Sequence, residues 1–392
     1  MAVPLLMICD SPSSVTGLGR ITRELATRIH TDLSDVFRVG TLAHGGSSGF
    51  KWPQYRAQVV PNTLVITNLP DVWDEFSKGQ EGILFTLLNA SWLQWFVEPD
   101  AMEPGSTKRF LKSGEFKRWG YFPIDATGPN EMTGAVESDI MGKFDRILMY
   151  TEWAQKLLKK RLPWHPTDHL PHGTDGKIFH PRDRKEARKK FIGTVVKRDD
   201  VSGSLDDGLL IGVIATNTPR KDWGLCFETC AELLRRGVHI GLWAHTDTFR
   251  SHWDLLTLAD DFGMRERTIF TNGSLPDETL AWGIAACNVT LGIGSGEGWG
   301  LPLAESLACG VPVVTHDYAA ATEFVPAEFR VEPAAWRWEG YHCNRRPVGD
   351  PSAWADKILE VKGKPCSLDE KFLWDGPNGA WSQWEKWLRA GL

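Results

Sequence analysis

The stretch VTLGIGSGEGWGLPLAESLACGVPVVT, residues 289–315, decides the fold of this chain. Its apolar run at 289–293 predicts a strand, and a second apolar run at 311–315 predicts another. Between them a glycine-rich loop leads into a predicted helix at 301–309. Pro302 suits the first turn of that helix, where the N–H group that proline lacks would have no partner in the helix. A strand, a helix and a strand in this order predict a parallel βαβ unit.

The same alternation extends upstream of this stretch. Strands are predicted at 209–215, 240–244 and 268–271, and helices at 223–236, 252–262 and 277–287. Apolar strands separated by helices of this length indicate a parallel sheet with helices on both faces. Ligands of such sheets bind outside the carboxyl ends of the strands. We therefore expect functional residues in the loops that follow these strands.

The amino-terminal half begins in a similar way. A strand at 4–9 is followed by a polar turn that contains Gly17, Gly19 and Arg20, and then by a predicted helix at 21–29. Further apolar runs lie at 36–41, 63–67, 82–88 and 146–150. No strand order can be drawn for 52–125. This half is therefore expected to hold a second Rossmann-like sheet with uncertain internal order.

One charged segment connects the two halves, and a tryptophan-rich helix ends the chain. The run 182–190 is highly charged and predicts an exposed helix, and 199–207 predicts a loop. Near the end of the chain, Trp381, Trp384 and Trp387 recur every three residues on one predicted helix. Such an apolar stripe must bury against another part of the protein.

Composition narrows the class of protein. The chain has 392 residues, enough for two domains, and 42% are hydrophobic, as in ordinary globular proteins. A net charge of −6 does not call for a polyanionic partner. Seven scattered cysteines show no metal-site spacing and predict reduced thiols, and no run is long enough to span a membrane. We expect a cytoplasmic protein without a metal cofactor. The 19 tryptophans serve mainly in packing, although flat rings also suit sugars and bases.

The loop after the strand at 289–293 has the strongest chemical signature. Its glycines allow a ligand to approach the backbone closely, and a helix N-terminus that favours phosphate follows. Glu297 and Glu305 flank that helix start and can accept hydrogen bonds from sugar hydroxyls. After the strand at 209–215 come two adjacent cations, Arg220 and Lys221, which suit a diphosphate. Together these features predict a site for a sugar diphosphate.

These residues resemble the retaining two-domain (GT-B) glycosyltransferases of group 1, also called family 4-like, which include mannosyl-, glucosyl- and sucrose-type enzymes. The match covers the acid pair with its seven intervening residues, the segment 308–315 and Glu323. In the family the first acid contacts hydroxyls of the transferred sugar and the second contacts the ribose of the nucleotide. The resemblance carries these roles to Glu297 and Glu305. It assigns the intervening loop to donor binding, with these members: Gly296, Gly298, Trp299, Gly300 and Leu301.

Other parts of the resemblance add residues to the expected site. Arg220 and Lys221 match the cations of the family, although the additional arginine that many members carry near Ala215 is missing here. His172 lies in a His-Gly-Thr-Asp turn at the end of the first domain, where a hydrogen-bonded hinge is as plausible as catalysis. Asn272 lies where the nucleotide base is expected. A looser match assigns Gly17, Gly19 and Arg20 to the donor phosphates.

The resemblance implies two Rossmann-like α/β domains that face each other across a cleft. We expect an acceptor-side domain at 1–175, a connection at 176–207, a donor-side domain at 208–370 and, at 371–392, a C-terminal helix that crosses back to the first domain. The implied reaction moves a hexose or pentose from a UDP- or GDP-sugar to a hydroxyl with retention of configuration. In it the departing phosphate takes the acceptor proton, and no metal is needed.

The acceptor stays open between glycan, lipid, protein and modified DNA. Asp125 is the best candidate for a base or an acceptor-positioning group in the first domain, although it is also suited to capping a turn. The segment 108–119 interleaves five cations with aromatic residues and could bind an anionic acceptor, or form a solvated loop. A phage-type transferase acting on hydroxymethylated DNA bases is therefore an alternative. A different Rossmann enzyme and a nucleotide-sugar-binding module without transfer are alternatives of another class.

Overall fold

The computed structural model describes residues 2–46, 48–101, 105–195, 208–340 and 343–391. The chain divides into two compact units. The first unit contains Met1–His172 together with Trp381–Leu392, and the second contains Gly173–Ala380. Each unit is built on its own parallel sheet.

The sheet of the first unit has the strand order β3-β2-β1-β4-β5-β6-β7, with all neighbours parallel. Its strands are β1 (Val3–Asp10), β2 (Phe37–His44), β3 (Gln54–Arg56), β4 (Gly82–Leu87), β5 (Phe116–Phe122), β6 (Arg146–Met149) and β7 (Thr167–His169). The strands predicted at 4–9, 36–41, 82–88 and 146–150 are confirmed. The one predicted at 63–67 is wrong, because the chain turns at Asn62, whose φ is 59°, and leaves only an isolated bridge between Val59 and Ile66.

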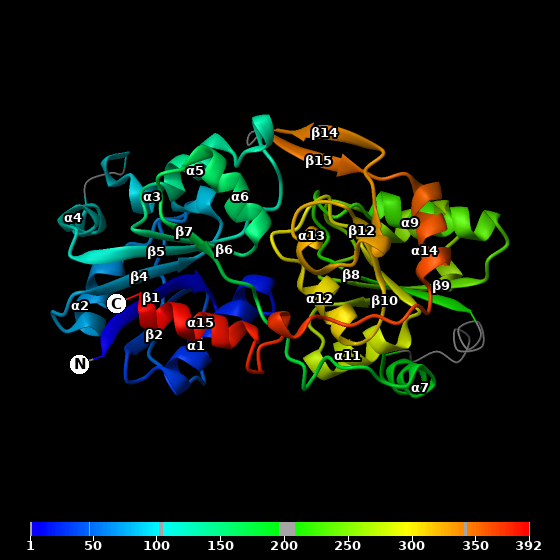
Figure 1. Cartoon of the computed structure of the whole chain (residues 1–392), viewed down its shortest axis with the longest axis horizontal. Helices are drawn as coiled ribbons and strands as arrows, with labels where there is room; N and C mark the ends of the chain where they lie inside the picture. Colours follow the sequence, from blue (N-terminus) through cyan, green and yellow to red (C-terminus); the bar gives the residue numbers. More distant parts are fainter. Residues whose placement is uncertain (1, 47, 102–104, 196–207, 341–342, 392) are drawn as a thin grey trace. The chain divides into compact units, whose positions relative to one another are not determined.

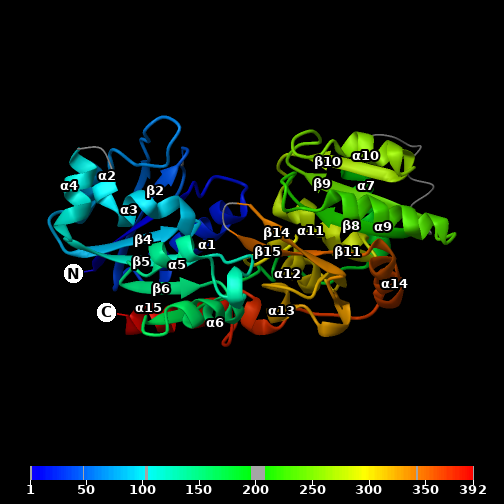
Figure 2. The ribbon, with the colours of Figure 1, turned by 90° about the horizontal axis from the view of Figure 1, so that it is seen from above.

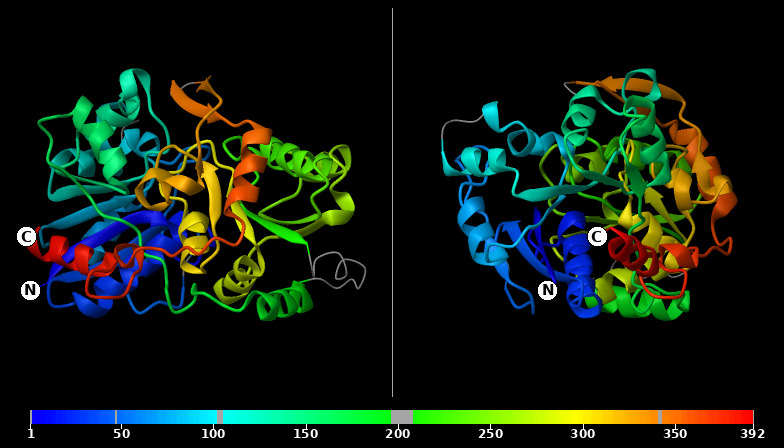
Figure 3. Two further views of the ribbon diagram at one scale, coloured as in Figure 1. Left: turned by 45° about the vertical axis from the view of Figure 1, so that its right-hand side comes forward. Right: turned by 60° about the vertical axis from the view of Figure 1, so that its left-hand side comes forward.

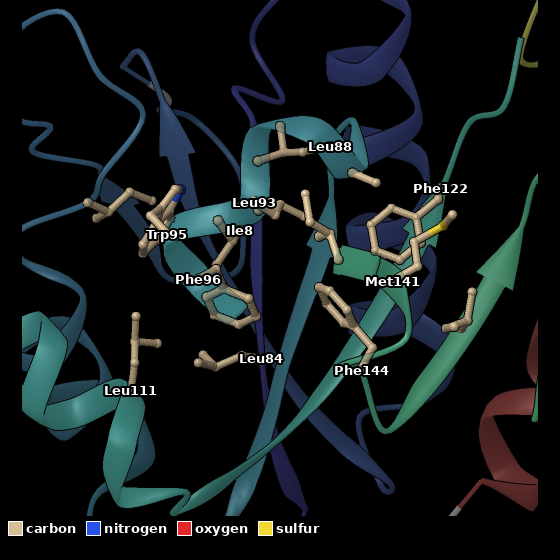
Figure 4. Packing of buried hydrophobic residues seen from close by; sticks show 14 of the residues in the cluster. Ile8, Leu84, Leu88, Leu93, Trp95, Phe96, Leu111, Phe122, Met141 and Phe144 are labelled. Atoms are coloured by element: carbon tan, nitrogen blue, oxygen red, sulfur yellow. The ribbon is translucent and has the colours of Figure 1, made fainter. Parts of the chain in front are cut away.

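Helices and one-turn 3-10 segments connect these strands. The α-helices are α1 (Gly17–Asp32), α2 (Leu69–Ser77), α3 (Gln94–Val97), α4 (Ser106–Ser113), α5 (Ala135–Met141) and α6 (Glu152–Arg161). The 3-10 turns are Ala90–Leu93, Pro99–Ala101 and Pro129–Glu131. One hydrophobic core lies between the sheet and this connecting chain, and Figure 4 shows Phe96, Phe122 and Phe144 meeting Leu84 and Met141 in it.

The C-terminal helix α15 (Ala380–Ala390) completes the first unit, as the resemblance implies, and Trp381 and Trp384 of its tryptophan stripe are buried there. Trp384 is fully buried, and its indole N–H donates to the carbonyl of Pro171 over 3.0 Å. The Trp384 ring packs edge-on against Tyr121 of β5, with 4.8 Å between the centroids. Figure 1 shows the helix in red beside α1, and Arg389 donates to the backbone carbonyl of Asp32 at the end of α1.

The second unit repeats the same winding. Its sheet has the order β10-β9-β8-β11-β12-β13, again parallel throughout, and Figure 2 shows the first four strands side by side in that order. The strands are β8 (Leu209–Ile214), β9 (Ile240–Thr246), β10 (Thr268–Asn272), β11 (Val289–Gly292), β12 (Val313–His316) and β13 (Arg330–Val331). In both units the order runs outward from the first strand in two directions, which is the doubly wound Rossmann pattern.

Helices cover both faces of this second sheet. They are α7 (Arg184–Val195), α9 (Trp223–Arg235), α10 (Leu255–Asp261), α11 (Asp277–Ala286), α12 (Leu301–Ala308), α13 (Ala321–Phe324) and α14 (Pro351–Val361). Its 3-10 turns are Arg265–Arg267, Ala327–Phe329 and Glu370–Phe372. Helices α7 and α11 pack together on one face, and α9 and α14 on the other (Figure 1). A separate antiparallel hairpin consists of β14 (Ala335–Glu339) and β15 (Asn344–Val348).

The two compact units divide the described residues at other positions than the expected domains do. The expected connection at 176–207 belongs to the second unit over 176–195, because Arg188 is buried there and donates to the carbonyls of Ala286 and Gly208. The loop predicted at 199–207 lies outside the described residues. The residues 371–379 also belong to the second unit, where Thr174 and Leu373 form a parallel bridge.

Candidate active site

Two loops of the second unit meet at the point where its strand order reverses. Strands β8 and β11 are neighbours, and the chain winds outward from them in opposite directions. A ligand crevice is expected at the carboxyl ends of such a strand pair. The loop after β8 carries Arg220 and Lys221, and the loop after β11 carries Glu297. The structure therefore brings together the three residues predicted to carry the charge chemistry of the site.

Backbone hydrogen bonds fasten these two loops to each other. Lys221 and Gly294 form an antiparallel bridge. The amide of Ser295 donates to the carbonyl of Arg220 over 2.9 Å, and the amide of Asp222 donates to the carbonyl of Ile293 over 2.9 Å. The positions of the side chains on both loops are thus fixed by the backbone.

Glu297 is held between the two cations. Arg220 Nη1 lies 2.8 Å from one carboxylate oxygen, and Lys221 Nζ contacts the other. Arg220 also donates to the carbonyl of Gly296 over 2.6 Å. Burial alone would raise the pKa of the Glu297 carboxyl, but the charges and hydrogen bonds of Arg220 and Lys221 outweigh it and lower the pKa to about 2. The carboxylate is therefore ionised throughout the physiological pH range.

Glycines make room for this arrangement. A Cβ atom at Gly294 would collide with the carboxylate of Glu297, so that acid lies directly over the backbone of the loop. Gly296 and Gly300 have φ values of 112° and 89°, which other residues rarely adopt. Gly300 is also the N-cap of α12, which begins at Leu301. The half-buried Gly298 lies between these two turns.

The remaining residues of this loop differ in their surroundings. Glu305 is 1% exposed on α12, so it is not a solvent-facing acid. Trp299 is 4% exposed, and its ring packs against Phe324 and Phe372 at centroid distances of 5.0 and 5.6 Å. The Trp299 ring is therefore a packing element of the second unit, and its expected part in donor binding stays a prediction.

The two cations stand just before α9, whose first turn is stabilised by another residue. Asp222 is the N-cap of α9, and its carboxylate accepts the amide of Leu225 over 3.0 Å. The carboxylate of Asp222 therefore compensates the partial positive charge at the start of α9. The charges of Arg220 and Lys221 are compensated separately, by Glu297 on the neighbouring loop. Asn272, the last residue of β10, is exposed at the edge strand of the same sheet.

The glycine turn of the first unit is a compact helix start. Thr16 caps α1 and accepts the amide of Gly19 over 3.1 Å, while its own hydroxyl donates to Asp10. A Cβ atom at Gly19 would lie 2.6 Å from the carbonyl oxygen of Ser11, so this position requires glycine for packing. Gly17 and Arg20 lie in the first turn of the same helix. The predicted glycine loop therefore exists, and packing alone explains one of its two glycines.

His172 and Asp125 differ from the simplest catalytic expectation. His172 is 2% exposed, and its Nδ1 lies 2.8 Å from the hydroxyl of Tyr121. Burial lowers the pKa of His172 to about 3, which keeps the imidazole neutral. His172 is thus a buried, hydrogen-bonded histidine, and its two expected roles, hinge and catalysis, stay predictions. Asp125 lies half-buried in the loop after β5, at the carboxyl end of the first sheet.

Comparison with known proteins relates part of the chain to one family. Residues 254–372, which include Glu297 and Glu305, match the family model of the glycosyl transferases group 1. Over this stretch the chain is similar to that family of sugar-transferring enzymes. The D-inositol 3-phosphate glycosyltransferase of Acidothermus cellulolyticus is 27% identical over 194 residues. That similarity spans 45% of this chain and 39% of the relative, or about two fifths of the relative's length.

Solved structures agree with this chain in fold. Sucrose-phosphate synthase from Thermosynechococcus elongatus has a TM-score of 0.70 at 15% identity, and each chain is covered completely. HepE from Anabaena, solved with UDP-glucose, has a TM-score of 0.63 at 13% identity, with 91% of this chain and 89% of that one covered. The prediction of two Rossmann-like domains of the GT-B type is confirmed.

The structure corrects the predicted basic and aromatic segment at 108–119. Phe116 and Trp119 are buried in the first unit, at 7% and 1% exposed. Arg118 lies over the Phe116 ring and donates to a backbone carbonyl, and Lys112 forms an ion pair with Asp100. Phe116 and Trp119 are core residues whose rings cannot stack on a ligand, and Phe110 packs partly buried against the same core.

Other polar residues near the carboxyl edge of the first sheet were not among the predicted site residues. Tyr150 follows β6 at the carboxyl edge of the first sheet, is 3% exposed, and its hydroxyl has no hydrogen-bond partner among the described residues. Burial and the charge of Asp10 both raise the pKa of Tyr150. Asp10 and His44 lie opposite each other at the ends of β1 and β2. Asp10 directly follows the strand predicted at 4–9 and Tyr150 ends the one predicted at 146–150, and these positions were the available signal.

No group of acids, histidines and cysteines in the described part of the chain could hold a metal ion, and no helix there is long and apolar enough to cross a membrane. All seven cysteines are free thiols, and burial raises the pKa of Cys287 and Cys309 to about 12. These two thiols are therefore unreactive packing groups.

Proposed function

We propose that this protein transfers a sugar from a nucleoside-diphosphate sugar to a hydroxyl acceptor with retention of configuration. The observation that carries the proposal is the meeting of Arg220 and Lys221 on Glu297 at the switch point of the second sheet. Two adjacent cations beside a glycine-rich helix start form a site for a diphosphate. An acid between them adds a group that accepts hydrogen bonds from sugar hydroxyls.

The diphosphate binds in this proposal beside Arg220, Lys221 and the start of α12. Negative charge grows on the phosphate as the sugar–phosphate bond breaks, so fixed cations stabilise the transition state more than the bound donor. These cations supply the charge that a divalent ion provides in other transferases, and we expect transfer to survive chelation of metals. Glu305 lies one turn into α12 and is the proposed partner of the ribose hydroxyls.

The low pKa of Glu297 supports retention. A general base works best when its pKa lies near the working pH, and a carboxyl with a pKa of about 2 is too weak for that task. Glu297 therefore orients the sugar through its hydroxyls, and the departing phosphate oxygen accepts the proton of the acceptor. This route places the acceptor on the same face of the sugar as the leaving group, which retains the configuration.

The acceptor binds in this proposal at the carboxyl edge of the first sheet. Strands β1 and β4 form the switch point of that sheet, and Asp10 ends β1. Asp125 and the Tyr150 hydroxyl follow β5 and β6 along the same edge. These groups exchange hydrogen bonds with acceptor hydroxyls, while Gly17, Gly19 and Arg20 remain proposed contacts of the donor phosphates.

Calorimetric titration with nucleotides tests the donor site. UDP, GDP, ADP and NAD are titrated into the protein, with UDP first because the HepE structure holds UDP-glucose. We expect one nucleoside diphosphate to bind and Lys221→Met to weaken it at least 10-fold, the effect of removing a charge-assisted contact. The exposed Lys362→Met is the matched control and keeps the affinity of the wild type. Binding of NAD alone would instead favour a different Rossmann enzyme.

Product analysis tests the transfer itself. The nucleotide that binds is supplied as its sugar conjugate with glycan, lipid, protein and hydroxymethylated-DNA acceptors, and mass spectrometry records the product. We expect the anomeric configuration, measured by NMR, to match that of the donor. An inverted product refutes the proposed mechanism, whereas donor binding without any product or donor hydrolysis favours a binding module.

A further inference from the structure

The hairpin of β14 and β15 presents exposed aromatic rings. Trp336 and Trp338 are 39% and 62% exposed, and they are two of the four tryptophans in the described residues that are more than a third exposed. They are two residues apart on β14, so both side chains leave the same face of the hairpin. Figure 3 shows the hairpin extending beyond the helices of its own unit.

This face, which we call the tryptophan face, also carries positive charge. It consists of Trp336, Trp338 and the residues opposite them, Pro347 and Arg345. The guanidinium of Arg345 lies 4.3 Å from the centroid of the Trp336 ring. None of these four residues is acidic, so the face is cationic even though the whole chain has a net charge of −6.

The acid on the opposite face of the hairpin does not neutralise the tryptophan face. Glu339 is the acidic residue of the two strands β14 and β15, and it is paired with the guanidinium of Arg346 over 2.6 Å. Arg337 is exposed and has no hydrogen bond or ion pair to a described residue. Arg337 and Arg345 are therefore available to an anionic partner.

The hairpin is held rigidly beside the candidate active site. A two-stranded hairpin is marginally stable alone, so it needs anchors. Arg346 is 5% exposed and donates to the carbonyl of Ser295, two residues before Glu297. The hydroxyl of Tyr318 donates to the carbonyl of Arg345 over 2.6 Å, and its ring meets the edge of Trp336.

We propose that the tryptophan face binds single-stranded nucleic acid, with bases stacked on Trp336 and Trp338. Exposed aromatic rings beside cations are the combination that recognises single strands, because the rings stack on bases and the cations attract phosphates. The two tryptophans are about 6.6 Å apart along the strand, twice the 3.4 Å base rise of a duplex. This spacing suits neighbouring bases that are spread apart and does not suit a stacked double helix.

The binding is a property of the hairpin and does not depend on the proposed transfer. Its consequence for transfer does rest on the proposed function: a bound strand would lie beside the Glu297 loop, and a hydroxyl of the nucleic acid would be the acceptor. The two proposals can fail separately, because strand binding is measured without a donor and donor binding without a strand.

Fluorescence anisotropy with a labelled oligothymidylate of about 20 nucleotides tests this proposal in the full-length protein. We expect Trp338→Ala to weaken binding about 5- to 100-fold, the effect of losing one stacked base, and Trp338→Phe to retain most of the affinity. Trp164→Ala, which removes a tryptophan that is 76% exposed in the first unit, is the matched control and leaves binding unchanged. All three variants are expected to bind the nucleoside diphosphate as the wild type does.

Salt and probe controls identify the partner. We expect Arg345→Gln to reduce the slope of log affinity against log salt by about 0.7, the value for one phosphate contact on a single strand. An abasic strand of equal length should bind much more weakly, because it keeps the phosphates and lacks the bases. The proposal is overturned if the wild type does not bind oligothymidylate, if Trp338→Ala binds as the wild type does, or if the abasic strand, a duplex or phosphatidylserine vesicles bind better.

Discussion

Replacing Glu297 with Gln separates the stability of the site from its chemistry. Glutamine keeps the size of the side chain and removes the charge that Arg220 and Lys221 share. The pKa of Glu297 falls from its ordinary value of 4.5 to about 2 in the folded protein. At about 1.4 kcal/mol for each pKa unit this corresponds to about 3 kcal/mol of stability. The three side chains are 12–28% exposed, which lowers the expected loss to roughly 2–3 kcal/mol.

Urea unfolding at pH 7 measures this loss, with Glu328→Gln as the control because Glu328 is an exposed acid of the same unit. The free energy of unfolding should fall by roughly 2–3 kcal/mol in Glu297→Gln, and by less than about 0.5 kcal/mol in the control. A carboxyl whose pKa is lowered on folding stabilises the folded protein fully when the pH is above the pKa of that carboxyl in the unfolded chain. The difference between wild type and variant should therefore shrink as the pH falls from 4.5 towards 2.

Pyrophosphate adds a second measurement to the same variant. In the wild type a bound diphosphate must approach the Glu297 carboxylate, which repels it, whereas in Glu297→Gln the two cations are free of that acid. We expect pyrophosphate to stabilise the variant more than the wild type, although transfer is lost. If Glu297→Gln unfolds at the urea concentration of the wild type, the ion-paired arrangement does not exist in solution and the reasoning fails.

Three further predictions concern packing and pH. Gly294→Ala should abolish nucleotide binding and cost about 1–3 kcal/mol, because the added methyl meets the neighbouring carboxylate; unchanged calorimetric affinity would contradict this. Trp384→Ala should cost about 3–5 kcal/mol in urea unfolding, and the exposed Trp164→Ala less than about 0.5 kcal/mol; similar losses in both would refute the docking of α15. Burial lowers the pKa of His172 to about 3 and of His316 to about 4, so the unfolded chain binds their protons first as the pH falls below 6.5. Each histidine should therefore lower the free energy of unfolding by about 2 kcal/mol at pH 5 relative to pH 7. Urea unfolding at both pH values should show that replacing both histidines with Gln removes this loss.

The sequence predicted the second unit better than the first. Its strands are continuous apolar runs separated by helices of regular length, and this local pattern contains most of the information in a βαβ fold. In the first unit, β5 includes Lys117 and Arg118, so its composition resembles a surface segment. The structure pairs it between β4 and β6 and buries Phe116 and Trp119, which only the neighbouring strands could decide.

The candidate site was predictable in its charges and less so in its packing. Glycines, spaced acids and adjacent cations follow strands in the sequence, so Glu297, Arg220 and Lys221 could be selected before their contacts were known. The indole of Trp299 could not be assigned in the same way, because its burial against Phe324 and Phe372 depends on residues far along the chain. The same limit applies to Arg346, which reaches the site loop from 51 residues away.

The sequence by itself determined that this chain forms doubly wound α/β sheets and that the residues proposed to bind phosphate follow the strands of the second one. Those properties are local, since they depend on apolar runs, glycine positions and helix starts. Only the tertiary structure decided that Arg220 and Lys221 share one carboxylate, that Trp299 is buried, and that two tryptophans remain exposed on a hairpin. Ion pairing and burial depend on which distant segments meet, and residue spacing along the chain does not encode that.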